Sequence, residues 1–509
     1  MAFARVFSAQ TELLSGRVVS VEVDTSRGLN HFAIVGLGDR AVGEARDRVA
    51  AALKNSGFES PKSKNQKTVV SLSPADVRKE GAHFDLAIAL GYLATDTVRL
   101  PNPDTAMFVG ELALDGAVRP ARGVLAMALA ALRSGFQEIY VPFENADEAA
   151  LADGLAVHPV RSLRELVSHL RGEARIPAHA RTQVCGIRTL PEVDMADIVG
   201  HEGAKRGLLI AAAGGHNVLM HGPPGTGKTM LARAFAGILP PLSRDEAMEV
   251  SSVHSVAGSG SVFSFDPPFR SPHHTSSHVS VIGGGTPPRP GEITLAHCGV
   301  LFCDEFPEFD RRVIESLRQP LEEQRVSIAR SKGSALFPAR FMLVAAMNPC
   351  PCGYRGSRAK ACTCSAADLL RYRRKLSGPV LDRIDMGLHV STVHYERLAA
   401  GSSGARSEVL RKEVEAARER AYARSRAAGI DPVLNAHLRA KDARAMLCVS
   451  KDAEAMLGQS AERLSLSARS YHRVLKLART IADLADAEEI LSEHVLEALR
   501  YRPQTDLLG

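Results

Sequence analysis

One segment of this 509-residue sequence has the residue types and the spacing of a phosphate-binding loop. The pattern G-x-x-x-x-G-K-[S/T] is matched by Gly222, Pro223, Pro224, Gly225, Thr226, Gly227, Lys228 and Thr229. The apolar residues 217–220 (NVLM) before it predict a strand, and residues 229–238 (TMLARAFAGI) after it predict a helix. Loop amides and the helix N-terminus would then face a nucleotide, with Lys228 on its β and γ phosphates and Thr229 on Mg²⁺. A Gly/Pro turn without a ligand would not need all four parts in this order.

Such a loop needs carboxylates to hold the metal and to activate water, and both are expected at the end of a buried strand. Residues 299–305 (GVLFCDE) supply them, because the apolar residues 300–303 are followed directly by Asp304 and Glu305. We expect Asp304 to hold Mg²⁺ through water and Glu305 to polarise the attacking water. Away from a phosphate-binding loop, the same pattern is typical of an ordinary strand with a solvated end.

A third apolar stretch, residues 341–347 (FMLVAAM), ends in Asn348. We expect this asparagine to lie where the strand end approaches the γ phosphate and to sense the nucleotide there. Asparagine at a strand end is also a common turn former, which is the alternative.

Length and composition predict about three ordinary globular domains, with 45% hydrophobic and 24% charged residues. Strand and helix signals alternate in residues 1–170, predicting an α+β domain, and polar residues 171–191 predict a linker. The signals alternate again in residues 192–395, as expected of an α/β domain, and residues 405–509 predict a helical domain.

No stretch is apolar enough to predict a membrane helix. The longest, residues 123–132 (GVLAMALAAL), has 10 residues, whereas a membrane helix needs about 18. The sequence does not open on a basic stretch followed by an apolar one, so we expect no secretory leader, and 8 cysteines are too few for a disulfide framework. We therefore expect a cytoplasmic protein. Its net charge of +6, from 63 basic and 57 acidic residues, would suit a polyanionic partner without requiring one.

Further motifs make the whole sequence resemble AAA+ ATPases of the magnesium-chelatase type, and within them the ComM/YifB family. They are residues 211–218 (AAAGGHNV), 269–276 (FRSPHHTS), 283–297 (GGGTPPRPGEITLAH) and 347–353 (MNPCPCG). The resemblance implies an ATP-binding, Mg²⁺-dependent AAA+ core with a helical lid.

The resemblance also assigns three polar residues. It implies that Asn348 is the sensor 1 residue, Arg383 the arginine finger and Arg469 the sensor 2 arginine of the lid. An arginine finger acts on a neighbouring subunit, so the resemblance implies a closed homo-oligomeric ring, usually a hexamer. The alternatives are an ion pair of Arg383 with the flanking Asp382 or Asp385, and a solvated helix face for Arg469.

Two basic segments bear on the substrate. Residues 324–340 predict a hairpin with a basic tip at residues 330–334 (RSKGS); the hairpin carries Arg325, Arg330 and Lys332 along its length. It resembles a presensor hairpin, which would place these residues in the ring channel to grip DNA phosphates; an edge hairpin whose charges prevent aggregation is the alternative.

Residues 355–375 hold seven basic residues and one acidic residue, Asp368, so their net charge equals that of the whole chain. A solvated charged helix would have a similar composition.

Four of the cysteines, Cys350, Cys352, Cys362 and Cys364, lie within 15 residues. In a reducing compartment such pairs favour a soft metal such as Zn²⁺, which prefers four ligands. The C-x-C spacing is tighter than that of common zinc knuckles, so free thiols in a loop remain the alternative.

The first domain resembles the proteolytic domain of Lon, which has a ribosomal S5 domain 2-like fold, in residues 79–89 (KEGAHFDLAIA) and 110–120 (GELALDGAVRP). The nucleophilic serine of that family falls on His83 and its catalytic lysine on Leu125. Because proteolysis needs a nucleophile and a base, we expect a degenerate scaffold and not an active protease.

Together these features predict a ring ATPase that translocates on single-stranded or branched DNA. The family resemblance implies a helicase that drives branch migration in natural transformation and homologous recombination. The alternative is a chelatase-like ATPase that remodels a protein partner for metal insertion. That partner would carry a D-x-S-x-S signature, which this chain lacks, since residues 24–28 read DTSRG.

Overall fold

The computed structural model describes residues 2–76, 78–100, 104–180, 192–258, 263–285, 288–330, 333–356, 360–376, 378–393, 404–439, 441–442 and 446–503. Its contacts divide the chain into two compact units. The first contains Met1–Gly186 and Ala247–Ser264, and the second contains Ile187–Glu246 and Phe265–Gly509.

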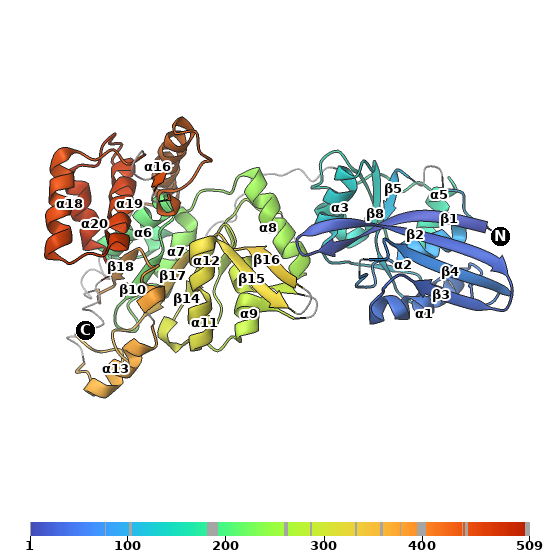
Figure 1. Ribbon diagram of the computed structural model, residues 1–509, viewed down its shortest axis with the longest axis horizontal. Helices are drawn as coiled ribbons and strands as arrows, with labels where there is room; N and C mark the ends of the chain where they lie inside the picture. Colours follow the sequence, from blue (N-terminus) through green and yellow to red (C-terminus); the bar gives the residue numbers. More distant parts are fainter. Residues whose placement is uncertain are drawn as a thin grey trace. The chain divides into compact units, whose positions relative to one another are not determined.

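The N-terminal unit is built on a seven-stranded mixed sheet with the order β3-β4-β2-β1-β5-β8-β9 (Figure 1). Its strands are β1 (Ala2–Glu12), β2 (Ser15–Arg27), β3 (His31–Val35), β4 (Gln66–Ser73), β5 (Ala106–Phe108), β8 (Glu138–Pro142) and β9 (Ala156–Val160). β2 pairs antiparallel with β1 and β4, and the other neighbours are parallel. A short hairpin, β6 (Glu111–Leu112) and β7 (Val118–Arg119), accompanies the sheet.

Helices cover both faces of this sheet, because alternate strand residues enter different cores. Phe108 joins a core with α1 (Arg40–Asn55), α2 (Asp85–Ala94) and α5 (Leu163–Leu170). Its neighbour Met107 joins a second core with α3 (Val124–Arg133) and α4 (Ala146–Ala149). The predicted combination of sheet and helices is therefore present, whereas the relation to Lon remains a prediction.

Two segments outside residues 1–170 also pack into the N-terminal unit. Ile176 is buried in its first core, and residues 181–191 of the predicted linker lie outside the described residues. Most of α8 (Arg244–Ala257), which follows the phosphate-loop helix in sequence, belongs to this unit. The Gly123 amide donates to the Ser255 carbonyl over 3.2 Å, and the Ser255 hydroxyl donates to Glu148.

The second unit contains a five-stranded parallel sheet with the order β11-β14-β17-β10-β18. The strands are β10 (Val218–His221), β11 (Phe269–Arg270), β14 (Val300–Cys303), β17 (Met342–Met347) and β18 (Met386–His389). Every residue of β14 and β17 is buried, as expected for parallel strands covered on both faces. The three strands predicted around the nucleotide motifs are therefore confirmed: β14 has the predicted bounds, β10 is shifted by one residue, and β17 starts one residue later.

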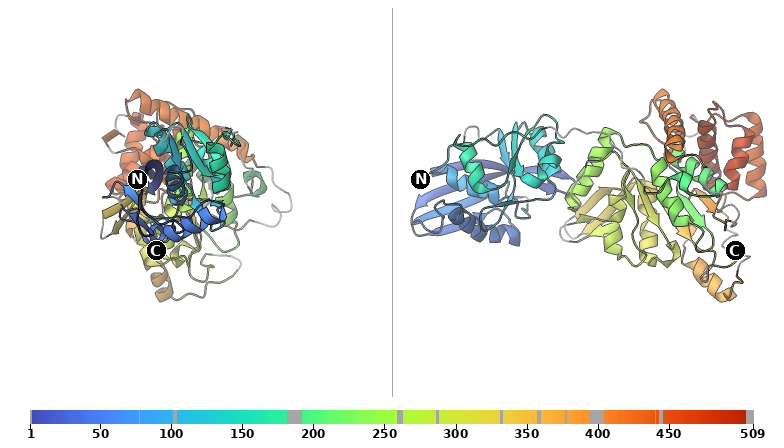
Figure 2. Two further views of the ribbon diagram at one scale, coloured as in Figure 1. Left: turned by 90° about the vertical axis from the view of Figure 1, so that its right-hand side faces the viewer. Right: turned by 180° about the vertical axis from the view of Figure 1, so that it is seen from behind.

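The two faces of this sheet carry different helices (Figures 1 and 2). Val344 and Ala346 join a core with α6 (Glu202–Gly214) and α7 (Lys228–Ile238). Leu343 and Ala345 join another with α11 (Arg311–Ser316) and the hairpin of β15 (Arg325–Arg330) and β16 (Gly333–Pro338). The smaller elements are α9 (His278–Ile282), β12 (Gly283–Gly284), β13 (Arg289–Pro290), α10 (Glu292–Leu295), α12 (Arg318–Glu323), α13 (Ala366–Arg374) and α14 (Gly378–Leu381).

The C-terminal part of this unit is helical, as predicted. Its main helices are α16 (Ser407–Ala427), α18 (Lys451–Arg463), α19 (Ala468–Leu484) and α20 (Ser492–Arg500). The core that contains α6 and α7 extends into these helices and includes their residues Val414, Leu457 and Ala478. Within the described part of the chain, no helix has both the length and the hydropathy needed to cross a membrane.

Candidate active site

The register of the parallel sheet brings three predicted segments to one edge. His221 of β10 pairs with Met347 of β17, and Cys303 of β14 pairs with Ala345. Because the strands are parallel, their carboxyl ends meet at the same edge. The loop that starts at Gly222, the Asp304-Glu305 pair and Asn348 therefore gather there.

The backbone of the phosphate-binding loop needs its glycines. Gly225 and Gly227 have φ angles of +74° and +84°, in the left-handed region that favours glycine. A side chain at Gly222 would place its Cβ 2.0 Å from the Val390 carbonyl oxygen. The loop leads directly into α7, whose first N–H groups have no acceptor within the helix and can bind an anion. The loop and the helix end therefore fit a nucleotide phosphate.

Lys228 is buried within the loop and held by three oxygens. Its Nζ donates to the carbonyls of Gly222 and Pro223, each over 2.8 Å, and to Asn348 Oδ1 over 3.2 Å. Burial lowers the pKa of Lys228, and the negative charges of Asp304 and Glu305 oppose this shift. The ammonium group is therefore fixed between the phosphate loop and the predicted sensor residue.

The two residues predicted to hold magnesium lie in direct contact. The Thr229 hydroxyl donates to Asp304 Oδ2 over 2.7 Å, and the other Asp304 oxygen accepts from the Glu305 amide over 2.9 Å. A hydroxyl and a carboxylate are hard oxygen donors, which Mg²⁺ prefers. The donor set therefore fits the ion that the phosphate loop requires.

Glu305 has an unusual backbone and an unpredicted partner. Its φ angle is +48°, which is uncommon for a residue with a side chain. Its Oε2 lies 3.1 Å from Nδ1 of His274, in the segment that precedes α9. The sequence gives no local signal for this contact, because His274 and Glu305 are far apart in the chain. The imidazole orients the carboxylate that is predicted to activate water.

Arg383 and Arg469 both bind Glu322 of α12. Arg383 Nη2 donates to Oε2 of this carboxylate, and Arg469 Nη2 donates to Oε1 over 2.5 Å. The hydrogen bond from Arg383 lowers the pKa of Glu322, and Arg469 contributes in the same direction. The described ion pair of Arg383 is thus with Glu322 and not with the flanking aspartates. The sequence carries no local signal for Glu322, since its partners are distant in the chain.

Asn217 ties the Arg383 segment to the central strands. Its side chain donates to the Arg383 carbonyl over 3.1 Å and accepts from the Leu343 amide over 2.9 Å. Its amide donates to Asp385 Oδ2 over 2.9 Å. Burial would raise the pKa of Asp385, but its hydrogen bond and charge interaction with His216 and the charge of Arg473 leave it lowered. This ionised carboxylate anchors the backbone just after Arg383.

The predicted basic hairpin forms, with Val326 opposite Phe337 and both side chains buried. Arg325 begins β15 and is exposed, and Arg330 ends this strand. Lys332 lies outside the described residues. One face of the hairpin is therefore fixed on the core.

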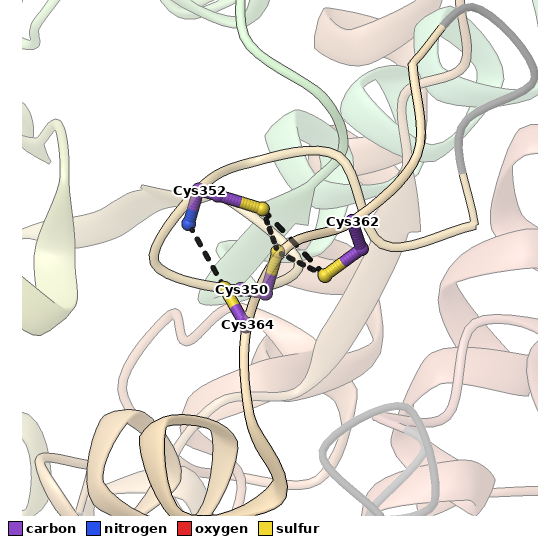
Figure 3. A group of neighbouring side chains, drawn as sticks. All are labelled: Cys350, Cys352, Cys362 and Cys364. Atoms are coloured by element: carbon purple, nitrogen blue, oxygen red, sulfur yellow. Dashed lines mark hydrogen bonds between the residues drawn. The ribbon is translucent and has the colours of Figure 1, made fainter.

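The four clustered cysteines meet, as Figure 3 shows. Their sulfur atoms all lie within 4.8 Å of one another, although the two pairs are ten residues apart in the chain. The convergence needed for a metal site is therefore present, and the loop holds the thiols together.

The two residues expected to fall on the catalytic positions of Lon lie in the N-terminal unit. His83 precedes α2, and its Nε2 is buried without a hydrogen-bond partner among the described residues. Leu125 is fully buried in α3. A leucine can supply no base at this position.

Comparisons with known families cover most of the chain. Residues 194–398 match the family described as magnesium chelatase, subunit ChlI. Residues 21–145 match subunit ChlI of Mg-chelatase, and residues 404–502 match the ChlI C-terminal family. The site described above lies within the first of these matches, apart from Arg469 in the C-terminal one.

Relatives of similar length match nearly the whole chain. The chain is 41% identical over 519 residues to the competence protein ComM of Haemophilus influenzae, covering 100% of this chain and 99% of that protein. It is 41% identical over 498 residues to YifB of Escherichia coli, covering 96% and 95%. A weaker similarity, 25% over 228 residues, links 41% of the chain to 25% of the DNA replication licensing factor Mcm6 of Drosophila melanogaster. The chain therefore belongs to the ComM/YifB family of magnesium-chelatase-like AAA+ ATPases.

Proposed function

We propose that this ATPase is a ring-forming DNA motor, a helicase that drives branch migration in natural transformation and homologous recombination. The observation that carries the proposal is the attachment of a basic helix to the nucleotide site. The Tyr372 hydroxyl of α13 donates to the Asn348 carbonyl over 3.2 Å, and Lys375 pairs with Glu308 over 2.6 Å. A change at the γ phosphate would thus reach a surface suited to a polyanion.

Bound ATP supplies the γ-phosphoryl group, and Mg²⁺ neutralises charge on its phosphates. Lys228 would hold the β and γ phosphates, while Thr229 and Asp304 would hold the ion. Glu305, oriented by His274, would accept a proton from the attacking water. Asn348, which already contacts Lys228, would read the presence of the γ phosphate.

The arginines require more than one subunit. Arg383 would act as the finger on the nucleotide of a neighbouring subunit, and Arg469 as the sensor 2 residue of the lid. Stabilisation of transition-state charge by such a finger is worth about 10³ to 10⁵ in rate. We therefore propose a closed homo-oligomer, a hexamer by analogy with the family.

Contacts to DNA would be basic and independent of sequence. Arg325, Arg330 and Lys332 on the hairpin are the proposed pore residues, and α13 presents further arginines, of which Arg371 and Arg374 are exposed. The similarity to Mcm6, named as a DNA replication factor, supports this substrate class. Such binding is expected to weaken steeply with salt, because it releases counterions.

The decisive test measures ATP hydrolysis by the purified chain without DNA and with single-stranded, forked or four-way-junction DNA. A DNA motor is expected to show a several-fold higher kcat with at least one of these. No stimulation by any of them, together with no salt-sensitive binding, would overturn the proposal.

The matches to ChlI, a magnesium-chelatase subunit, favour a second candidate, in which the ATPase remodels a protein partner for metal insertion. In that case a partner protein with a metal-ion adhesion site would stimulate hydrolysis and DNA would not. The N-terminal unit would serve as a degenerate scaffold in either function.

A further inference from the structure

The geometry of the four clustered cysteines matches a metal site better than a disulfide. The Cys350 sulfur lies 3.3 Å from that of Cys352 and 3.7 Å from that of Cys362, and the last two are 3.6 Å apart. A disulfide would bring two sulfurs to about 2.05 Å. Four sulfurs about 2.3 Å from one zinc ion would be separated by about 3.8 Å along the edges of their tetrahedron.

Backbone amides are aimed at these sulfurs. The Cys352 amide donates to Cys364 Sγ, and the Arg355 amide donates to Cys350 Sγ, each over 3.4 Å. Such donors stabilise thiolates and orient them as ligands. Cys350 is buried and the other three are half-buried, so the cluster is shielded without being closed to an entering ion.

We propose that Cys350, Cys352, Cys362 and Cys364 bind one Zn²⁺ ion that fastens the basic helix α13 to the nucleotide site. The first two cysteines follow Asn348 almost directly. The last precedes Ser365, whose hydroxyl caps α13 by accepting from the Asp368 amide over 3.2 Å. The ion would therefore hold together the two ends of the segment that joins β17 to α13.

The cysteine loop and α13 approach the nucleotide site at three points. A Cβ at Gly353, in the turn after the first cysteine pair, would lie 2.7 Å from Pro224 of the phosphate loop. Tyr372 reaches the Asn348 carbonyl, and Lys375 reaches Glu308 just beyond Glu305. The ion would add a further attachment of α13 to the site, beside the direct contacts of Tyr372 and Lys375.

The role of the ion in DNA coupling rests on the proposed function, whereas the metal site itself does not. The zinc content of the full-length chain is measured after purification without added chelators. One zinc per chain is expected in the wild type and in Cys448→Ser, which changes an exposed cysteine outside the cluster. Cys364→Ser is expected to lose the zinc. Absence of zinc from the wild type, or equal zinc in Cys364→Ser, would overturn the inference.

A conservative variant separates loss of a ligand from loss of folding. Cys352→His offers an imidazole in place of one thiolate and is expected to retain the zinc, since three cysteines and one histidine also make a stable site. Cobalt bound to the wild type should show the intense visible absorption of a tetrahedral site and a sulfur-to-metal charge-transfer band. Cobalt spectra of an octahedral ion, without that band, would contradict the tetrathiolate site.

The coupling is tested with the same proteins. DNA stimulation of ATP hydrolysis is expected in the wild type, Cys448→Ser and Cys352→His and is expected to be lost in Cys364→Ser. Full stimulation in a zinc-free Cys364→Ser would overturn the fastening role. If the wild type holds one zinc but DNA leaves its rate unchanged, the proposed function fails while the metal site stands.

Discussion

Arg383 and Arg469 share one acceptor, because each binds a different oxygen of the Glu322 carboxylate. These are the two arginines proposed to act on the γ phosphate, one on a neighbouring nucleotide and one from the lid. Each arginine directs one terminal nitrogen, Nη2, to this carboxylate, and that nitrogen would have to leave Glu322 to bind a phosphate. Glu322 therefore competes with the nucleotide for both side chains.

Glu322→Gln is expected to release this competition. Ion pairs near the protein surface are worth about 0.2–1 kcal/mol, so the KM for ATP should fall by up to about fivefold. The neighbouring Glu323→Gln, which contacts Gln319 instead, is the matched control. Steady-state kinetics check this, and a KM equal to that of the control would contradict the competition.

Lys228→Ala and Glu305→Gln are expected to fail at different steps. Removing the buried ammonium should abolish binding of a fluorescent ATP analogue. Removing only the negative charge of Glu305 should preserve binding and slow hydrolysis by about 10² to 10⁴. Normal turnover in Glu305→Gln would exclude this carboxylate as the group that activates water.

Arg383→Ala tests whether the arginine acts between subunits. Alone, it should bind ATP and hydrolyse it about 10³ times more slowly or worse. Mixed with Lys228→Ala, it should regain part of the rate, because one kind of subunit supplies the nucleotide site and the other the arginine. Mixed rings no faster than the separate variants would place Arg383 in its own subunit's site.

The burial of His83 is expected to lower the free energy of unfolding in acid. Burial lowers its pKa to about 4, whereas an unfolded histidine titrates near 6.5. Between these values the unfolded chain binds more protons, so the stabilisation is complete above pH 6.5 and is lost as the pH falls towards 4. At pH 5 the loss is about 2 kcal/mol.

Thermal unfolding at pH 7.5 and pH 5 checks this expectation. His83→Gln should lose less of its Tm on acidification than the wild type. His31→Gln, at an exposed position on β3, is the control. An equal loss in all three proteins would show that His83 does not contribute.

Local spacing was sufficient for the nucleotide motifs. The order of strand, glycine loop, Lys228 and helix is contained in about twenty consecutive residues. The apolar strands that lead to Asp304 and Asn348 are also short local patterns. Parallel pairing then places these ends together, because each strand leads into the same edge. The helical C-terminal part also follows from local pattern.

Pairs that form only by tertiary packing could not be found in this way. His274 meets Glu305, and Glu322 meets Arg469, across separations that no periodic pattern encodes. Asn217 had only the appearance of a strand start, yet its side chain joins two strands to the Arg383 segment. The cysteine cluster could be predicted in part. The four cysteines indicated a set of metal ligands, but the sequence could not show that their sulfur atoms lie close together.

The most direct measurement of a DNA motor follows strand separation of a labelled forked duplex by the wild type and by Glu305→Gln, with and without ATP. The wild type is expected to displace the strand only with ATP, and Glu305→Gln is expected to bind the fork without displacing it. Hydrolysis of ATP by the wild type with no displacement of forked or four-way-junction DNA would contradict the motor.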